Sequence, residues 1–368
     1  MVSSKPGSSF GPSHHDSGVS SIEKLITDDS VIEVPQNYVI SDQESPVSDG
    51  TILATIPTID MRQLVLINQS ANKDELEKLH STCKEWGIFQ QLVNHGVSSA
   101  LLDKVKQDLE AFFNLPLEEK MRYKVRPGDV EGYGTVVKSQ DQKLDWGNRL
   151  YMFTNPRRKP HLFPELPTSL RNTLEWYMLE LQRIARTLLG FMGKLLKMKM
   201  EEMEELFQDG LQSLRMTQYP PCPQPGLVGG LRPHSDGSGI TILHQVNGVQ
   251  GLQIKKDGAW FPVIFNHGAF VVNVGDILEI LSDGLYKSIE HRVIVNPEKE
   301  RISIAMFFMP KLESEIGPVT ALRDPQKPPS PGKIGMEKFV ENYFAHNLNG
   351  KTPLERIRTK DGEENTTA

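Results

Sequence analysis

Two histidines and one aspartate in the second half of the chain have types and spacing that suit a catalytic metal ion. His234 and Asp236 are separated by one residue, and His291 follows much later. Alternate side chains of a strand point to the same side, so His234 and Asp236 could face one metal ion from a single extended segment. Two imidazoles and one carboxylate can bind one face of a ferrous ion and leave the other positions open for dioxygen chemistry. Taken singly, a His-x-Asp triplet arises often by chance, and His291 could be a hydrogen-bonded or surface histidine.

An arginine and a serine follow the last histidine. Arg301 and Ser303 are separated by one residue, so in a strand they would also share one face. A guanidinium can pair with a carboxylate through two hydrogen bonds, and a hydroxyl can donate a further one. The pair therefore suits a co-substrate that carries a carboxylate. The alternative for Arg301 is a surface salt bridge with Glu298 or Glu300.

The composition narrows the class of protein. The 368 residues are 24% charged and 38% hydrophobic, which is typical of a soluble globular protein. The net charge of −6, without a long basic run, disfavours a nucleic-acid partner. No apolar stretch approaches the ~18 residues of a membrane span, and the polar first residues do not resemble a secretory signal. The only cysteines, Cys83 and Cys222, fit a reducing compartment. We expect a monomeric, cytoplasmic protein with no membrane contact.

Hydrophobic periodicity predicts helices in the first half and short strands in the second. Helices are expected over Ser20–Ile26, Lys73–Trp86, Ser99–Asn114, Ser169–Met198 and Met336–His346. Strands are expected over Ile56–Asp60, Phe89–Val93, Phe270–Val274 and Ile302–Phe308, with a hairpin about the Asp257-Gly258 turn. Many short strands with glycine-containing turns favour a β-sandwich or jelly roll over a parallel sheet.

Several segments resemble the plant iron(II)- and 2-oxoglutarate-dependent dioxygenases. They are His234–Gly239, Gly275–Glu279, Ser288–Arg292, Glu300–Ala305, Tyr219–Pro225, Asn94–Val97, Phe112–Pro116 and Gln142–Trp146. The similarity runs from about Ser20 to about Arg358. Within the family, the chain is most similar to the branch of senescence-related proteins, alkaloid O-demethylases and norcoclaurine-synthase-like oxygenases.

The resemblance implies an α+β fold. Its core would be a double-stranded β-helix, a form of jelly roll, preceded by a mixed helical domain. We expect a disordered arm over 1–18, the N-terminal mixed α/β dioxygenase domain over 19–160, and a long helix with a connector over 161–207. The jelly-roll domain would span 208–311, and a C-terminal helix and tail would span 312–368.

The resemblance also implies roles for six residues. His234, Asp236 and His291 would bind Fe(II) as the catalytic centre. Arg301 and Ser303 would hold the distal carboxylate of 2-oxoglutarate, and Tyr219 would add a phenolic hydrogen bond. The reaction implied is oxidation of a small apolar or aromatic plant specialised metabolite through a ferryl oxidant. It would consume O2, release succinate and CO2, use ascorbate as reductant, and end in hydroxylation or O-demethylation.

The chain departs from the family pattern at a few places. Thr217 stands where relatives usually have Asn near the co-substrate. Gln90 and Gln91 lie in a segment one residue longer than usual, which predicts a β-bulge.

Other departures lie in apolar segments. His244 replaces a usual Leu and could be a core histidine or a substrate-facing group. Phe308 and Met309 could form an apolar wall beside the substrate or simply pack in the core.

Two other functions use the same residues. A jelly roll could hold a small molecule without turnover. A zinc hydrolase could use the same three ligands, but it would need a positioned acid or base and would leave Arg301 and Ser303 unexplained.

Overall fold

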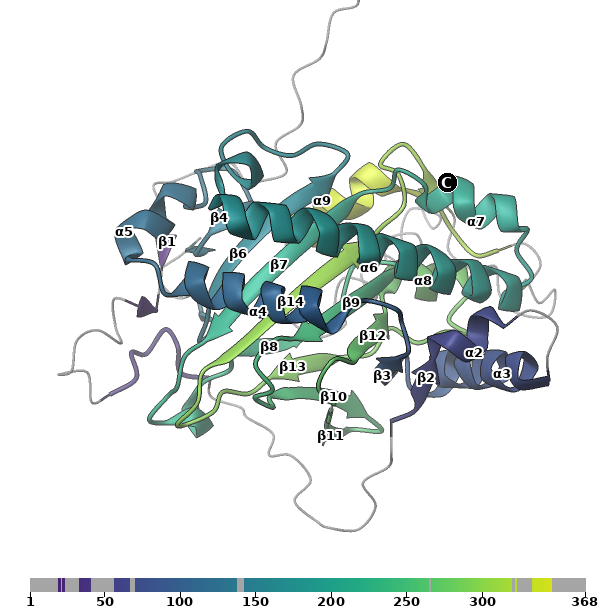
Figure 1. Ribbon diagram of the computed structural model, residues 1–368, viewed down its shortest axis with the longest axis horizontal. Coiled ribbons are helices and arrows are strands. Elements are labelled where there is room, and N and C mark those ends of the chain that lie inside the picture. Colours follow the sequence, from purple (N-terminus) through teal and green to yellow (C-terminus); the bar gives the residue numbers. More distant parts are fainter. Residues whose placement is uncertain are drawn as a thin grey trace, which may run out of the picture.

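The computed structural model describes residues 19–20, 22–23, 33–40, 56–66, 70–137, 142–264, 266–319, 322 and 333–345. Two β-sheets form its centre, and long helices cover one face of the larger sheet (Figure 1). No helix of this described part is long and apolar enough to cross a membrane.

The larger sheet has eight strands. They are β2 (Thr58–Asp60), β3 (Ile88–Val93), β4 (Gly132–Tyr133), β6 (Asn148–Asn155), β7 (Gln212–Tyr219), β9 (Ile240–Gln245), β12 (Phe270–Val274) and β14 (Arg301–Phe308). Their order in space is β2-β3-β12-β9-β14-β7-β6-β4. Only the β2–β3 pair is parallel; the other neighbours are antiparallel.

The smaller sheet has four strands: β8 (Leu231–His234), β10 (Leu252–Lys256), β11 (Ala259–Pro262) and β13 (His291–Val293). Their order in space is β11-β10-β13-β8. The chain passes from one sheet to the other after β7, β8, β9, β11, β12 and β13. This alternation makes the two sheets a jelly roll, and the predicted α+β class is confirmed.

The remaining elements surround these sheets. The helices are α2 (Met61–Val65), α3 (Ser70–Glu85), α4 (Ser99–Phe113), α5 (Leu117–Lys120), α6 (Thr168–Leu195), α7 (Met200–Phe207), α8 (Asp276–Leu281) and α9 (Met336–Ala345), with 3-10 turns η1 (Met121–Tyr123), η2 (Phe163–Glu165) and η3 (Pro225–Leu227). Two-residue strands form the pairs β1 (Val19–Ser20) with β5 (Thr135–Val136), and β15 (Glu315–Ile316) with β16 (Ile334–Gly335).

Helix α6 covers the large sheet, with α4 packed beside it (Figure 1). Its predicted apolar stripe is buried at Leu174, Met178, Leu181, Leu188 and Met192. Each such side chain stabilises the fold by about 2 kcal/mol through burial. The helices predicted over 73–86, 99–114, 169–198 and 336–346 correspond to α3, α4, α6 and α9, with ends shifted by a few residues.

Strand alternation gives the large sheet two different faces. On β14, Ile302, Ile304 and Met306 lie in the main hydrophobic core. Arg301 and Ser303 lie on the opposite face, which we call the inner face because it turns toward the smaller sheet. This face carries the polar groups of the candidate site.

The predicted bulge at the two glutamines is confirmed. Between two paired positions, β12 has the single residue Val271, whereas β3 has both Gln90 and Gln91. The Gln90 Oε1 atom accepts a hydrogen bond from the backbone N–H of Ile264 (3.3 Å), and Gln91 Oε1 accepts one from Asn266 Nδ2 (2.8 Å). The bulge absorbs the extra residue, so the strand keeps its facing on both sides.

The division into domains stays a prediction. The large sheet is continuous across residue 160, because β3 pairs with β12 and β6 pairs with β7, and both β12 and β7 belong to the predicted jelly roll. The arm over 1–18 and most of the expected helix Ser20–Ile26 lie outside the described residues; Ser20 itself is in β1.

Gly87 is placed where any side chain would clash. Its φ is +65°, and a Cβ there would lie 2.0 Å from the backbone oxygen of Lys287, in the segment that leads to His291. We predict that Gly87→Ala lowers the free energy of unfolding by more than about 2 kcal/mol. Gly128 is the matched control, since its φ is +76° and nothing lies within 4 Å. Gly128→Ala should cost about 1 kcal/mol, measured by urea unfolding; equal losses would refute the steric argument.

Candidate metal and co-substrate site

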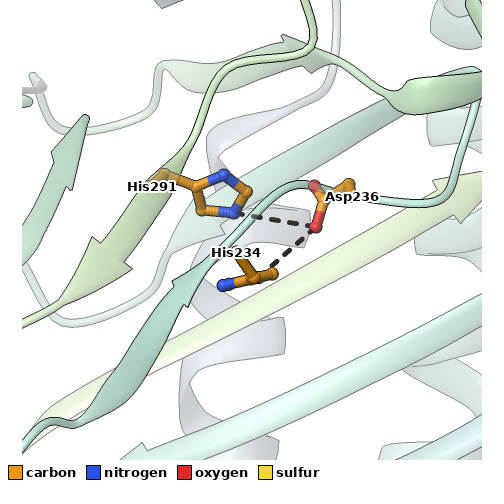
Figure 2. A group of neighbouring side chains, drawn as sticks. All are labelled: His234, Asp236 and His291. Atoms are coloured by element: carbon orange, nitrogen blue, oxygen red, sulfur yellow. Dashed lines mark ion pairs between the residues drawn. The ribbon is translucent and has the colours of Figure 1, made fainter. Parts of the chain in front are cut away.

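Two neighbouring strands and one turn bring the predicted metal-binding residues together. His234 ends β8, His291 begins β13, and the two residues face each other in the antiparallel register. Asp236 follows in the turn toward β9. The His234 and His291 Nε2 atoms lie 3.5 and 3.6 Å from Asp236 Oδ1, and Figure 2 shows the three side chains turned toward one another. All three ligand atoms lie within 4.8 Å of one another, so they could hold one metal ion.

Backbone carbonyls fix the tautomer of both imidazoles. His234 Nδ1 donates to the carbonyl of Arg232 (2.8 Å), and His291 Nδ1 donates to that of Ile289 (3.1 Å). The proton is therefore on Nδ1, and the Nε2 lone pair is free to bind a metal. Burial and the neighbouring His234 lower the pKa of His291 to about 4, so its imidazole is neutral at pH 7.

The carboxylate of Asp236 is held by one oxygen. Its Oδ2 accepts hydrogen bonds from Thr241 Oγ1 on β9 (2.6 Å) and from Asn273 Nδ2 on β12 (2.8 Å). Oδ1 faces the two histidines. Burial raises the pKa of Asp236, but its interactions with His291 and His234 and the Thr241 hydrogen bond hold that pKa well below its ordinary value. Two imidazoles and one carboxylate suit Fe(II).

Arg301 is a buried cation, with 1% of its surface exposed. Its Nε donates to Gln245 Oε1 (3.3 Å) and its Nη1 to Ser303 Oγ (3.2 Å), whereas Nη2 has no hydrogen-bond partner among the described residues. The guanidinium lies 5.1 Å from the centre of the Tyr219 ring, directly across the β14–β7 register. Burial lowers the pKa of Arg301, yet a guanidinium stays charged at pH 7.

The surface salt bridge considered for Arg301 is absent within the described residues. Glu300 instead accepts a hydrogen bond from Gln218 Nε2 (2.5 Å). A buried guanidinium with an unused donor fits the carboxylate of a bound co-substrate, because that carboxylate would satisfy both the charge and the free N–H.

The departures from the family pattern lie on different faces. Thr217 is buried on the inner face, opposite Ser303 in the register. His244 lies on the outer face among the rings of Tyr177 (6.1 Å) and Phe270 (5.6 Å), so it is a core histidine.

Phe308 lies on the outer face of β14, as Met306 does, and it packs with Met309 in the main core, so the structure favours packing over a wall beside the substrate.

Several residues of this site were not predicted from the sequence. Thr241 and Asn273 orient the aspartate, and Gln245 orients Arg301. Their residue types are common in strands and loops, so only the register between β9, β12 and β14 identifies them.

Comparison with known proteins agrees with this geometry. Residues 210–310 match the 2OG-Fe(II) oxygenase superfamily, and residues 56–176 match the N-terminal region described as that of a non-haem dioxygenase in morphine synthesis. Protein SRG1 of Arabidopsis thaliana is 47% identical, over 92% of this chain and 96% of its own length. Codeine O-demethylase of Papaver somniferum is 45% identical, over 89% of this chain and 93% of its own. The crystal structure of JOX2 with 2OG, Fe and JA superposes with a TM-score of 0.83 at 31% identity, covering 93% of this chain and 98% of that one.

The chain belongs to the 2OG-Fe(II) oxygenase superfamily. It is an oxidoreductase that uses Fe(II) and 2-oxoglutarate and acts on a small molecule. The family assignment sets aside the hydrolase and the silent binding protein.

The hydrogen bond from Thr241 gives a direct test of how Asp236 is positioned. We predict that Thr241→Val weakens Fe(II) binding about 10- to 100-fold, because the carboxylate loses the partner that orients it. Thr82 is the matched control, since its buried hydroxyl has no partner in the described structure. Anaerobic titration should leave the Fe(II) affinity of Thr82→Val unchanged; an equal effect of both changes would contradict the assignment.

The buried His244 should make stability depend on pH. Burial, followed by the charges of His267 and His95, lowers its pKa to about 4. Between pH 6.5 and 4 only the unfolded chain binds this proton, so stability falls as the pH falls. From pH 7.5 to 5 the metal-free protein should lose about 2 kcal/mol more than His244→Leu, measured by urea unfolding. Identical losses would show that His244 titrates normally in the folded state.

Proposed function

We propose that His234, Asp236 and His291 bind Fe(II) and that Arg301, Ser303 and Tyr219 hold the distal carboxylate of 2-oxoglutarate. The observation that carries the second part is the unused Nη2 donor of the buried Arg301, for which the described chain offers no carboxylate. The convergence of the two Nε2 atoms and Asp236 Oδ1, which lie within 4.8 Å of one another, supports the first part.

The roles of the side chains follow from their surroundings. Bound Fe(II), with 2-oxoglutarate, supplies the oxidising power drawn from O2. His234 and His291 present lone pairs whose direction is fixed by backbone carbonyls. Arg301 supplies a positive charge in a water-poor interior, where it attracts a carboxylate more strongly than it would in water. Ser303 and Gln245 hold that guanidinium in place.

We propose that the substrate is a plant specialised metabolite and that the product is hydroxylated or O-demethylated. Relatives are named as O-demethylases of codeine, thebaine and a flavonoid. In the balanced reaction, one oxygen atom of O2 enters a substrate C–H bond and the other enters succinate, with loss of CO2. When the hydroxylated carbon is an O-methyl group, the hemiacetal breaks its C–O bond and formaldehyde leaves.

An aromatic group near the inner face supports an apolar or aromatic substrate. Tyr151 and Phe153 lie on β6 with their rings 5.6 Å apart, and Phe344 of α9 lies 6.0 and 6.1 Å from them. Such rings favour flat, apolar ligands.

We further propose that the protein works in the cytoplasm as a monomer without a nucleic-acid partner. The free, buried thiols of Cys83 and Cys222 support a reducing compartment. Light scattering of the purified protein tests the monomer.

Arg301 is the critical residue for the co-substrate. We predict that Arg301→Ala weakens 2-oxoglutarate binding by about 1.5–3 kcal/mol, because a charged hydrogen-bonded contact is lost. The matched control is Arg122→Ala, an exposed arginine paired with Glu119 (3.0 Å). Calorimetric titration under nitrogen compares the two variants. An unchanged affinity in Arg301→Ala would remove this residue from the co-substrate site.

Turnover tests the proposal as a whole. The purified enzyme, with Fe(II), 2-oxoglutarate and ascorbate, is incubated with a plant metabolite library. Mass spectrometry then follows oxygen gain, methyl loss and succinate. We expect succinate in proportion to product, and we expect none from His234→Ala. Full activity of that variant would remove His234 from the ligand set.

A further inference from the structure

Two more arginines lie on the inner face, apart from Arg301. Arg149 of β6 stands opposite Thr217 of β7, which stands opposite Ser303 of β14. Side chains at directly opposite positions point to the same side of a sheet, so Arg149 shares the face of Ser303. Arg215 lies two residues before Thr217 on β7 and therefore points to the same side.

The two guanidinium-bearing residues flank one threonine. Arg215 Nε donates to Thr217 Oγ1 (3.3 Å), and Arg149 is the residue directly across from that threonine. Burial and the charge of Arg215 lower the pKa of Arg149 to about 10. The charge of Arg215 also reaches His291. Arg215 therefore lies within electrostatic range of His291.

No carboxylate of the described chain forms a salt bridge with either arginine. Their acceptors are neutral: the carbonyl of Gly134 for Arg149 (3.2 Å) and the hydroxyl of Thr217 for Arg215. Several other arginines form salt bridges with carboxylates, as Arg158 does with Glu175, Arg183 with Glu180 and Arg232 with Asp145. Two neighbouring, partly buried positive charges repel each other unless an anion joins them.

We propose that Arg149 and Arg215 bind a carboxylate of the substrate, so that this oxygenase acts on a carboxylic acid. The inference rests on the proposed function, in which the inner face holds the substrate. A guanidinium pair offers forked donors that match the two carboxylate oxygens.

We place this subsite and that of 2-oxoglutarate at different positions along β7. Arg215 lies four residues from Tyr219 along β7, which corresponds to about 13 Å in a strand. The distal carboxylate is assigned to the Tyr219 end. At the other end, Tyr151 stands opposite Arg215 in the register, and its ring contacts Phe153 and Phe344. The subsite thus joins a cationic part to an aromatic one, as an acid with an apolar body requires.

Pairs of acids and methyl esters test the proposal, because esterification removes the charge and keeps the body. The probes are 4-methoxycinnamic, dehydroabietic and dodecanoic acids, each with its ester. Each is titrated calorimetrically into the full-length enzyme loaded with Fe(II) and 2-oxoglutarate under nitrogen. We expect at least one acid to bind about tenfold or more tightly than its ester, the effect of one charged contact.

Substitutions then test whether the two arginines cause the preference for acids over esters. Arg149→Met and, separately, Arg215→Met should reduce the acid-to-ester ratio to below about twofold, and Arg149→Lys should retain part of it. The control Arg122→Met, at an exposed site, should keep the full ratio. The thermal midpoint of Arg149→Met should be equal to or above that of the wild type, because a like-charge repulsion is removed.

Three results would overturn the subsite: esters that bind as tightly as their acids, no binding of any acid, or a preference that survives both Met variants. Before the acids are added, 2-oxoglutarate itself is titrated into the Fe(II)-loaded enzyme, and this titration tests the proposed function separately. If 2-oxoglutarate fails to bind, the proposed function fails. If it binds and no acid is preferred, only the subsite fails.

Discussion

The site depends on one carboxylate held where the two sheets meet. Asp236 lies two residues after the end of β8 in the smaller sheet and precedes β9 of the larger one. Its Oδ2 is bound to the larger sheet through Thr241 and Asn273, and its Oδ1 faces the histidines of the smaller sheet. A buried carboxylate is costly unless its oxygens are satisfied. The position of Asp236 therefore requires both sheets to be in register.

The two faces of the large sheet have different roles: the outer face stabilises the fold, and the inner face carries the polar groups of the candidate site. The outer face packs apolar side chains under α6, and this burial stabilises the fold. The inner face holds Arg301, Arg149 and Arg215, for which the described chain provides no salt bridge. Such groups oppose folding. The fold tolerates these charged groups because apolar burial on the outer face offsets their cost, and because bound anions would neutralise them.

Most of the residues that distinguish this chain from the family pattern leave the inner face unchanged. The bulge at Gln90 and Gln91 keeps the facing of β3 unchanged. His244 lies in the outer core, where it affects stability rather than the substrate. Thr217 is different, because it lies on the inner face between Ser303 and Arg149. It is therefore the departure that lies beside the residues proposed to bind ligands.

The sequence by itself identified the candidate metal ligands, the Arg301–Ser303 pair and most of the helices, because spacing and periodicity are local properties. It also predicted the bulge, since one extra residue in a strand has few other outcomes. It did not reveal β6 as a strand, nor Thr241, Asn273, Arg149 and Arg215 as parts of the site. These residues become partners only through hydrogen-bonded register between strands distant in sequence. Tertiary structure alone decides which face each one shares, because a shift of one residue would turn it to the other side.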